Sequence, residues 1–313
     1  MSILIRLIAA LALAGIALPA AAQDKVRLLL DWFVNPDHAA LVIAKQRGIF
    51  TKHGLDVELI APADPNAPPK LVAAGQAEYA VSYQPTLQML VAEGLPLVRV
   101  GVLVAQPLNS LVALEDGPVK SIADFKGRKI GYSVAGFEEA ILGEILEKAG
   151  LTLKDVTLIN VNFALTTALM SKQVDGVIGA FRNFELNDLA LHKTKGRLWP
   201  VETSGVPTYD ELILVTKRET VDVGRTRKLL AAIAEATGWL KANPDEAWGI
   251  FSKSGKELDN ELNKLAWKDT LPLLAVDPTV LDRARYTAFA DFLVKRGLIK
   301  QTPAPDSYLR EIR

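Results

Sequence analysis

The sequence predicts an α/β protein of two lobes, each with a mostly parallel sheet flanked by helices. Three observations predict this fold: strand-like and helix-like segments alternate, the same order recurs about 100 residues later, and the chain has 313 residues. Strands that alternate with helices are typical of βαβ units, in which the strands run parallel. The length also exceeds that of one typical domain, about 100–200 residues, which favours two lobes.

The first set of alternating segments begins with an apolar run that is typical of a buried strand. A helix follows it and stops at Gly48. The expected order is strand 26–30, helix 38–47, strand 55–60, helix 70–74 and strand 78–83.

The second set repeats this order: strand 129–133, helix 138–149, strand 156–161, helix 164–170 and strand 176–181. Residues 75–81 align by eye with residues 172–178, and the two strands that follow end in an aromatic residue, Tyr83 or Phe181. This repeat indicates two lobes of similar build. The alternative is a coincidence between ordinary α/β patterns.

Turn-forming residues indicate where the lobes meet. They cluster at residues 115–118 and 204–207, and an extended run at 211–216 would return the chain to the first lobe. The remaining segments are helical. We therefore expect a discontinuous lobe 1 at residues 23–114 and 208–313, which carries the C-terminal helices, and lobe 2 at residues 115–207. The two crossings between them would form a hinge.

The N-terminus has the three parts of a secretory signal peptide. Arg6 is its positive charge, residues 7–18 are apolar, and small residues at 20–22 offer a cleavage site. The apolar run is shorter than the roughly 20 residues that span a bilayer, which disfavours the alternative of an uncleaved anchor. We expect residues 1–22 to be removed after Ala22 and the mature protein to be periplasmic, with no membrane-spanning segment.

Composition excludes several classes of function. The chain has 36 basic and 36 acidic residues, so it lacks the excess positive charge that nucleic-acid binding needs. It has no cysteine, which excludes disulfides, thiolate metal sites, a cysteine nucleophile and a lipid-anchored thiol. No phosphate loop, zinc motif or nucleophile elbow is present. We therefore expect no catalytic residue, no metal and no cofactor.

Ligands of parallel sheets bind beyond the carboxyl ends of the strands. Aromatic, amide and acidic residues gather at these positions, and aromatic rings stack on flat heterocycles. The candidate ligand-binding residues are Trp32, Asp37, His38, Tyr83, Tyr132, Phe137, Asn162, Phe181, Asn183 and Glu185. Simpler roles are open for some of them: Trp32 could pack between the lobes, His38 could begin a helix, and Glu185 could be solvated.

Charge at the expected cleft favours a neutral or cationic ligand. A helix N-terminus is a natural anion site, but Glu138 and Glu139 already bring negative charge to the helix after residue 133. A sulfonate, nitrate or phosphate would compete with these carboxylates. Arg182 could serve an anion, although we interpret it as the partner of a nearby carboxylate.

Several segments resemble one family of transport proteins. The stretch from Asp31 to His38 and residues 179–185 resemble the thiamine-pyrimidine-precursor (hydroxymethylpyrimidine-type) binding proteins of ABC importers. That family shares its fold with the eukaryotic pyrimidine precursor synthase. Residues 54–57 and 127–131 also occur in sulfonate, taurine and nitrate binders, so they indicate only the superfamily.

The resemblance implies a type II-like periplasmic binding protein that closes about its hinge on a small heterocycle and delivers it to an ABC transporter permease. It implies a monomer. Trp32 and Tyr83 would contact the ring, Glu185 would bind its amino edge, and Asn183 and Tyr132 would assist. At position 182 the family often has an aromatic residue, whereas this chain has Arg182. The resemblance therefore does not identify the substituent on the ligand ring.

Two other functions remain open from the sequence. The first is a binder of a sulfonate, taurine, nitrate or another heterocycle. The second is a pyrimidine precursor synthase, which the absence of cysteine and the export signal disfavour.

Overall fold

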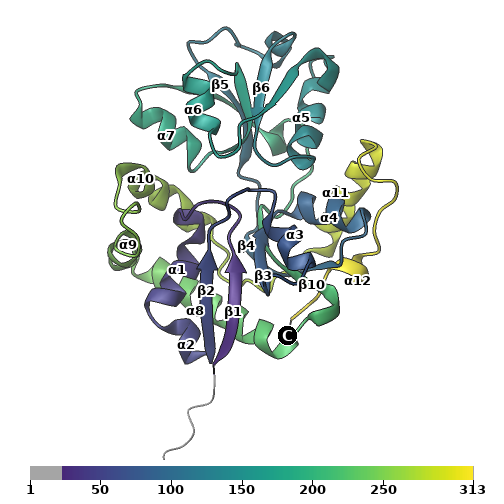
Figure 1. The fold of residues 1–313 in the computed structure, drawn as a ribbon. Coiled ribbons are helices and arrows are strands. Elements are labelled where there is room, and N and C mark those ends of the chain that lie inside the picture. Colours follow the sequence, from purple (N-terminus) through teal and green to yellow (C-terminus); the bar gives the residue numbers. More distant parts are fainter. Residues whose placement is uncertain (1–22, 313) are drawn as a thin grey trace, which may run out of the picture.

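The computed structural model describes residues 23–312, and the predicted signal peptide lies outside the described residues. Figure 1 shows two lobes, each with a central sheet and helices packed against it. Each sheet has five strands. The prediction of a two-lobed α/β fold is confirmed.

The lobe 1 sheet has the strand order β2-β1-β3-β10-β4. Its strands are β1 (Asp24–Leu29), β2 (Leu55–Ile60), β3 (Tyr79–Ser82), β4 (Leu97–Val104) and β10 (Leu212–Lys217). β1 pairs in parallel with β2 and β3, whereas β10 is antiparallel to β3 and β4. β3 and β4 are buried along their whole lengths, as expected for strands covered on both faces.

The lobe 2 sheet has the corresponding order β7-β6-β8-β5-β9. Its strands are β5 (Asn109–Leu114), β6 (Lys129–Tyr132), β7 (Thr157–Asn160), β8 (Gly176–Phe181) and β9 (Gly196–Pro200). β6 is parallel to β7 and β8, and β5 is antiparallel to β8 and β9. In each sheet, the fourth strand in this order is the one that the chain enters directly from the other lobe.

The repeat that the sequence indicates is structural. Helices α3 (Pro68–Ala73) and α6 (Leu165–Met170) start 97 residues apart, as do β3 and β8. The turn between helix and strand contains a residue with positive φ in both lobes, Gly75 at 75° and Lys172 at 61°. Both lobes therefore use the same left-handed turn, which glycine adopts without strain and lysine does not.

The helices of the last third of the chain pack on lobe 1 (Figure 1). α8 lies against α1 and α2, α11 against α4, and α12 against β4. The lobe 1 helices are α1 (Ala39–Gln46), α2 (Ile49–Lys52), α3, α4 (Gln84–Ala92), α8 (Val223–Ala242), α9 (Pro244–Ser252), α10 (Glu261–Thr270), α11 (Arg283–Lys295) and α12 (Pro305–Tyr308). Lobe 2 has α5 (Phe137–Glu147), α6 and α7 (Glu185–Leu191). No helix among residues 23–312 is long and apolar enough to cross a membrane.

The predicted boundary between residues 114 and 115 needs correction. β5 pairs with β8 and β9, so residues 109–114 belong to lobe 2 and the first crossing lies at residues 105–108. The turn-rich residues after β5 only reverse the chain within lobe 2. Turn chemistry shows where a chain reverses but not which sheet a strand joins. The second crossing lies between β9 and β10 and includes the predicted boundary at residues 207 and 208.

Candidate ligand-binding site

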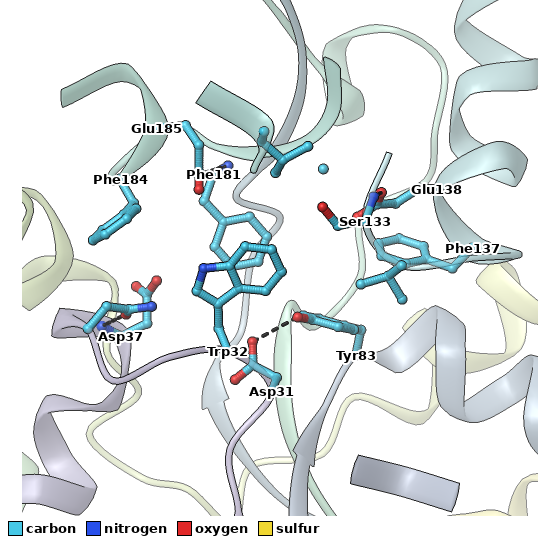
Figure 2. A pocket seen from close by; sticks show the side chains of 14 residues that line it. Asp31, Trp32, Asp37, Tyr83, Ser133, Phe137, Glu138, Phe181, Phe184 and Glu185 are labelled. Carbon is cyan, nitrogen blue, oxygen red and sulfur yellow. Dashed lines mark hydrogen bonds between the residues drawn. The ribbon is translucent and has the colours of Figure 1, made fainter. Parts of the chain in front are cut away.

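A cavity lies between the lobes at the carboxyl ends of β1, β3, β6 and β8 (Figure 2). This is the position that the strand-end rule predicts for parallel sheets. The fourteen residues that line it are Asp31, Trp32, Asn35, Asp37, Tyr83, Ser133, Val134, Phe137, Glu138, Leu165, Gly179, Phe181, Phe184 and Glu185.

Aromatic rings from both lobes form much of the cavity wall. Tyr83 stacks on Phe137 with ring centroids 5.7 Å apart, and its edge meets Phe181 at 6.4 Å. Trp32 packs edge-on against Phe163 at 4.6 Å. Trp32, Tyr83 and Phe181 face the same space (Figure 2). Rings arranged in this way can hold a flat aromatic ligand by stacking.

Asp31 anchors the lobe 1 side of the cavity. The Tyr83 hydroxyl donates to Asp31 Oδ2 at 2.8 Å, and His38 Nε2 lies 2.9 Å from Asp31 Oδ1. The backbone N–H of Asn35 donates to His38 Nδ1 at 3.3 Å. Because Nδ1 accepts, the ring proton resides on Nε2 and is donated to Asp31. His38 therefore orients Asp31, which in turn fixes the Tyr83 ring.

Three further acidic side chains line the cavity, and burial raises the pKa of each. Burial raises the pKa of Glu185 to about 8, although the backbone N–H of Phe181 donates to its carboxylate at 2.7 Å. Burial also raises the pKa of Asp37 to about 6, although the Asn183 side chain donates to its carboxylate. Burial raises the pKa of Glu138 well above its ordinary value. Glu185 is therefore mainly protonated at neutral pH, when it can both donate and accept a hydrogen bond.

Glu138 occupies the position where a helix would bind an anion. Its side chain accepts from the backbone N–H of Ser133 at 2.7 Å, in the loop between β6 and α5, and Glu139 accepts from the backbone N–H of Gly136, the N-cap residue of α5. No lysine or arginine is among the fourteen lining residues that the structure describes. A bound anion would find no cation in this lining to offset the loss of its hydration, so the cavity favours neutral or cationic groups.

Arg182 pairs with a carboxylate, as the sequence analysis interprets it. Its guanidinium donates to both oxygens of Glu202, at 2.7 and 2.9 Å, and to the carbonyl oxygens of Pro107 at 2.9 Å and Leu108 at 3.3 Å. Those carbonyls belong to the first crossing between the lobes. Glu211, at the end of the second crossing, accepts from the backbone N–H groups of Leu108 and Asn109 and so links the two crossings. Arg182 thus stabilises the crossing between the lobes and does not line the cavity.

Six of the ten candidate residues line the cavity, and their contacts with a ligand remain predictions: Trp32, Asp37, Tyr83, Phe137, Phe181 and Glu185. The other four do not line this cavity, and their contacts with a ligand also remain predictions. His38 lies behind Asp31. Tyr132 is half-buried, and the adjacent Ser133 lines the cavity instead, because neighbouring side chains on an extended segment point to opposite sides.

The remaining two candidates, Asn162 and Asn183, form hydrogen bonds with other parts of the protein. Asn162 is exposed, has a φ of 52°, and accepts a hydrogen bond from the Ser133 hydroxyl through its backbone carbonyl. Asn183 is buried, and its amide nitrogen donates to Asp37 Oδ1 at 2.7 Å and to Thr270 Oγ1 at 2.8 Å. Asn183 therefore links lobe 2 to lobe 1.

Eight lining residues are absent from the ten candidate ligand-binding residues, although the sequence analysis places Glu138 at the cleft: Asp31, Asn35, Ser133, Val134, Glu138, Leu165, Gly179 and Phe184. Asp31 carried a usable signal, since it is an acidic residue directly after an apolar strand run. The sequence around Gly179 carried no such signal. A Cβ at Gly179 would lie 2.4 Å from Glu138 Oε1, and its φ is +99°, so only glycine lets Glu138 pack here.

The lobes contact each other on both sides of the cavity. On one side are the bonds of Asn183, and Asn187 on α7 also donates to Asp269 on α10 at 2.8 Å. On the other side, Asn66 donates to the Ser133 carbonyl at 3.2 Å and accepts from the Ala135 N–H at 2.9 Å. Separation of the lobes would break these bonds, so they stabilise the arrangement that encloses the cavity.

The buried carboxyls make stability depend on pH. The pKa values of Asp37, Glu211 and Glu185 are raised to about 6, 7 and 8, mainly by burial. A carboxyl with a raised folded-state pKa holds its proton more tightly in the folded chain, so its contribution is complete below about pH 4 and is lost as pH rises through the folded value. We expect the free energy of unfolding in urea to fall between pH 5 and pH 8.5. A rise over this interval would contradict the burial of these groups.

The structure offers no metal centre within the described residues. No group of three or more His, Cys, Asp or Glu side chains among residues 23–312 could hold a metal ion.

Comparison with known proteins identifies the family. The NMT1/THI5 like family model matches residues 35–247. A thiamine biosynthesis protein of Haemophilus influenzae is 53% identical over 298 residues, which cover 95% of each chain. The formylaminopyrimidine-binding protein of Halalkalibacterium halodurans is 32% identical over 81% of this chain and 77% of its own. A pyrimidine phosphate synthase of Legionella pneumophila is 23% identical over 85% of this chain and 86% of its own.

Solved structures show the same fold. The alkanesulfonate-binding protein of Xanthomonas axonopodis pv. citri superposes with a TM-score of 0.74 over 93% of this chain and 99% of its own, at 16% identity. At that identity the likeness concerns the fold, which is the two-lobed fold of periplasmic binding proteins. The chain belongs to the NMT1/THI5-like family.

Proposed function

We propose that this protein is the solute-binding component of an ABC importer and that its ligand is a thiamine-precursor pyrimidine. The observation that carries the proposal is the cavity between the lobes, which combines aromatic walls with buried carboxyls and has no lysine or arginine among its described lining residues. A flat ring with amino groups satisfies both features. The 32% identical relative named for formylaminopyrimidine supports this ligand class.

Glu185 suits the edge of an aminopyrimidine. That edge has an N–H donor on the amino group and an acceptor on the neighbouring ring nitrogen. A protonated carboxyl has the complementary acceptor and donor. The raised pKa of Glu185, about 8, keeps this form available at neutral pH. A site built on such pairs rejects ligands without the matching groups, because its buried polar atoms would then lack partners.

Binding would favour closure of the lobes. A ligand shifts an open–closed equilibrium only through its different affinities for the two forms. Here the ring would contact Trp32 and Tyr83 of lobe 1 together with Phe181 and Glu185 of lobe 2, which all line one cavity. The closed protein, exported to the periplasm and monomeric, would then deliver the ligand to a membrane permease.

An anion binder is the second candidate, since the fold is shared with the alkanesulfonate-binding protein. Glu138 and Glu139 argue against it, because their carboxyls already accept from the backbone N–H groups of Ser133 and Gly136, which lead into α5 and would otherwise be free for an oxyanion. The chain is a binding protein rather than a synthase: the formylaminopyrimidine-binding protein is 32% identical to it, whereas the Legionella pneumophila synthase is 23% identical.

Titration calorimetry tests the proposal. The mature protein is titrated with 4-amino-5-hydroxymethyl-2-methylpyrimidine, its formylaminomethyl analogue, taurine and nitrate. We expect binding of one or both pyrimidines, and none of the anions. Binding of taurine or nitrate without either pyrimidine would refute the proposed ligand class.

A further inference from the structure

Trp32 follows β1 of lobe 1, but its side chain packs into the hydrophobic core of lobe 2. It is buried in an apolar cluster whose other members, within the described structure, all lie in lobe 2, among them Val161, Leu165 and Val177. Trp32 and Leu165 also line the cavity. The Trp32 ring therefore contacts both the core of lobe 2 and the space in which a ligand would bind.

Phe163 of lobe 2 makes the closer of two ring contacts of Trp32. Their centroids lie 4.6 Å apart at an interplanar angle of 71°, whereas Phe33 lies 5.6 Å from Trp32. Phe163 is half-buried and does not line the cavity. Edge-to-face contacts of this kind favour one relative orientation of the two rings. The geometry therefore lets Phe163 affect a ligand through the orientation of Trp32.

A left-handed backbone at Asn162 places Phe163. The φ of Asn162 is 52°, in a region that asparagine adopts more readily than most residues. Its N–H donates to Asn160 Oδ1 at 2.8 Å, and its carbonyl oxygen accepts from the Ser133 hydroxyl. These bonds fix the loop between β7 and α6, and neither uses the Asn162 side chain. The loop therefore depends on the backbone conformation of Asn162.

We propose that Phe163 is a positioning residue that holds the Trp32 ring in the orientation in which it stacks on the ligand. The inference rests on the proposed function, since it requires a ring in the cavity. Because Phe163 and Trp32 belong to different lobes, their contact exists only when the lobes are together. The closed form then has a higher affinity for a flat ring than the open form, which is the difference that ligand-driven closure requires.

A double-mutant cycle tests this coupling. Phe163→Ala and Trp32→Leu are made singly and together, and titration calorimetry measures the affinity of each variant. The ligand is 4-amino-5-hydroxymethyl-2-methylpyrimidine or its formylaminomethyl analogue, whichever binds the unmodified protein more tightly. We expect Phe163→Ala to weaken binding by about two- to tenfold, and to cause little further loss once Trp32 is replaced.

Two further variants show whether the effect comes from the ring contact. Phe163→Tyr keeps an aromatic ring and should bind like the unmodified protein. Leu198→Ala is the control for a loss of packing in lobe 2, because Leu198 on β9 packs against the same cluster and does not line the cavity. It should bind normally. A loss in Leu198→Ala equal to that in Phe163→Ala would assign the effect to the stability of lobe 2 and overturn the positioning role.

Two variants of Asn162 test the loop. Glycine adopts the left-handed backbone without strain, whereas the branched side chain of valine disfavours it. We expect Asn162→Gly to bind normally and Asn162→Val to weaken binding about as much as Phe163→Ala. Equal affinities of the two variants, weakened or not, would overturn the role of the Asn162 backbone in placing Phe163.

The outcomes separate this inference from the proposed function. If the unmodified protein binds neither pyrimidine, the proposed function fails. If it binds one of them but the losses from Phe163→Ala and Trp32→Leu multiply in the double variant, the two side chains act independently. In that case, or if Phe163→Ala binds normally, the positioning role is overturned while the proposed function stands.

Discussion

Replacing Glu185 with alanine is expected to weaken binding of 4-amino-5-hydroxymethyl-2-methylpyrimidine by about 10- to 100-fold. The substitution removes the donor and acceptor that face the amino edge of the ring. It also leaves the backbone N–H of Phe181, now bonded to Glu185 at 2.7 Å, without this partner. Calorimetry gives the affinity. Glu58→Ala, which removes an exposed carboxyl on β2 outside the cavity lining, is the matched control and should bind normally.

The pH dependence of binding gives an independent test of Glu185. The carboxyl and the ring share one proton in the complex, whichever of them carries it. Above pH 8 the free protein loses this proton, since the pKa of Glu185 is raised to about 8 by burial, with smaller contributions from Asp37 and Asp188. Binding must then take a proton up, so affinity should fall by up to about tenfold per pH unit. In Glu185→Gln this fall should disappear, because the amide donates and accepts without titrating. If the affinity of that variant still falls as steeply above pH 8, Glu185 is not the group responsible for the pH dependence.

Replacing Asn183 with alanine is expected to weaken all ligands by a similar factor, about 10- to 100-fold. Its amide donates across the lobes to Asp37 and Thr270, at 2.7 and 2.8 Å, and does not line the cavity. Loss of these bonds leaves a buried carboxyl without this partner and disfavours the closed form. Because the closed form binds the ligand, its lower population reduces the apparent affinity.

Two comparisons separate closure from direct contact. Asn187→Ala removes an exposed bond to Asp269 and a bond to the Asn183 carbonyl within lobe 2. It leaves the Asn183 amide bonded to Asp37 and Thr270, so it should weaken binding much less than Asn183→Ala. Small-angle scattering of the ligand-free proteins should show a larger radius of gyration for Asn183→Ala. An effect confined to one ligand, with unchanged scattering, would mean that Asn183 recognises the ligand and does not act through closure.

Much of the fold could be predicted because local signals agree with the global architecture. The sequence similarity between residues 75–81 and 172–178 marks the same turn and strand in each lobe, down to the positive φ of Gly75 and Lys172. The first lobe boundary could not be predicted in this way. The pairing of β5 with β8 and β9 is a long-range choice that its own residues do not encode.

The candidate site was predictable where it depends on strand ends. Trp32, Tyr83, Phe181 and Glu185 follow strands and meet at one cavity. Contacts between side chains were not predictable. Sequence cannot show that His38 turns toward Asp31, or that Asn183 reaches across to Asp37, because both depend on packing between distant segments.

Local capping patterns do not always mark the start of a helix. Asp277 followed by Pro278 resembles a helix start, but Asp277 accepts from the N–H and hydroxyl of Thr279 in a turn, and α11 begins at Arg283 with Asp282 as its cap. An aspartate can cap a turn or a helix by the same hydrogen bond, so the motif alone does not distinguish them.

The central claim is that the lobes enclose a flat nitrogen heterocycle. A crystal structure of the mature protein with 4-amino-5-formylaminomethyl-2-methylpyrimidine tests it most directly. The account predicts the ring between the aromatic side chains of Trp32, Tyr83 and Phe181, with its amino edge within hydrogen-bond distance of Glu185. A ligand bound elsewhere, or a ring whose amino edge points away from Glu185 toward solvent, would contradict it.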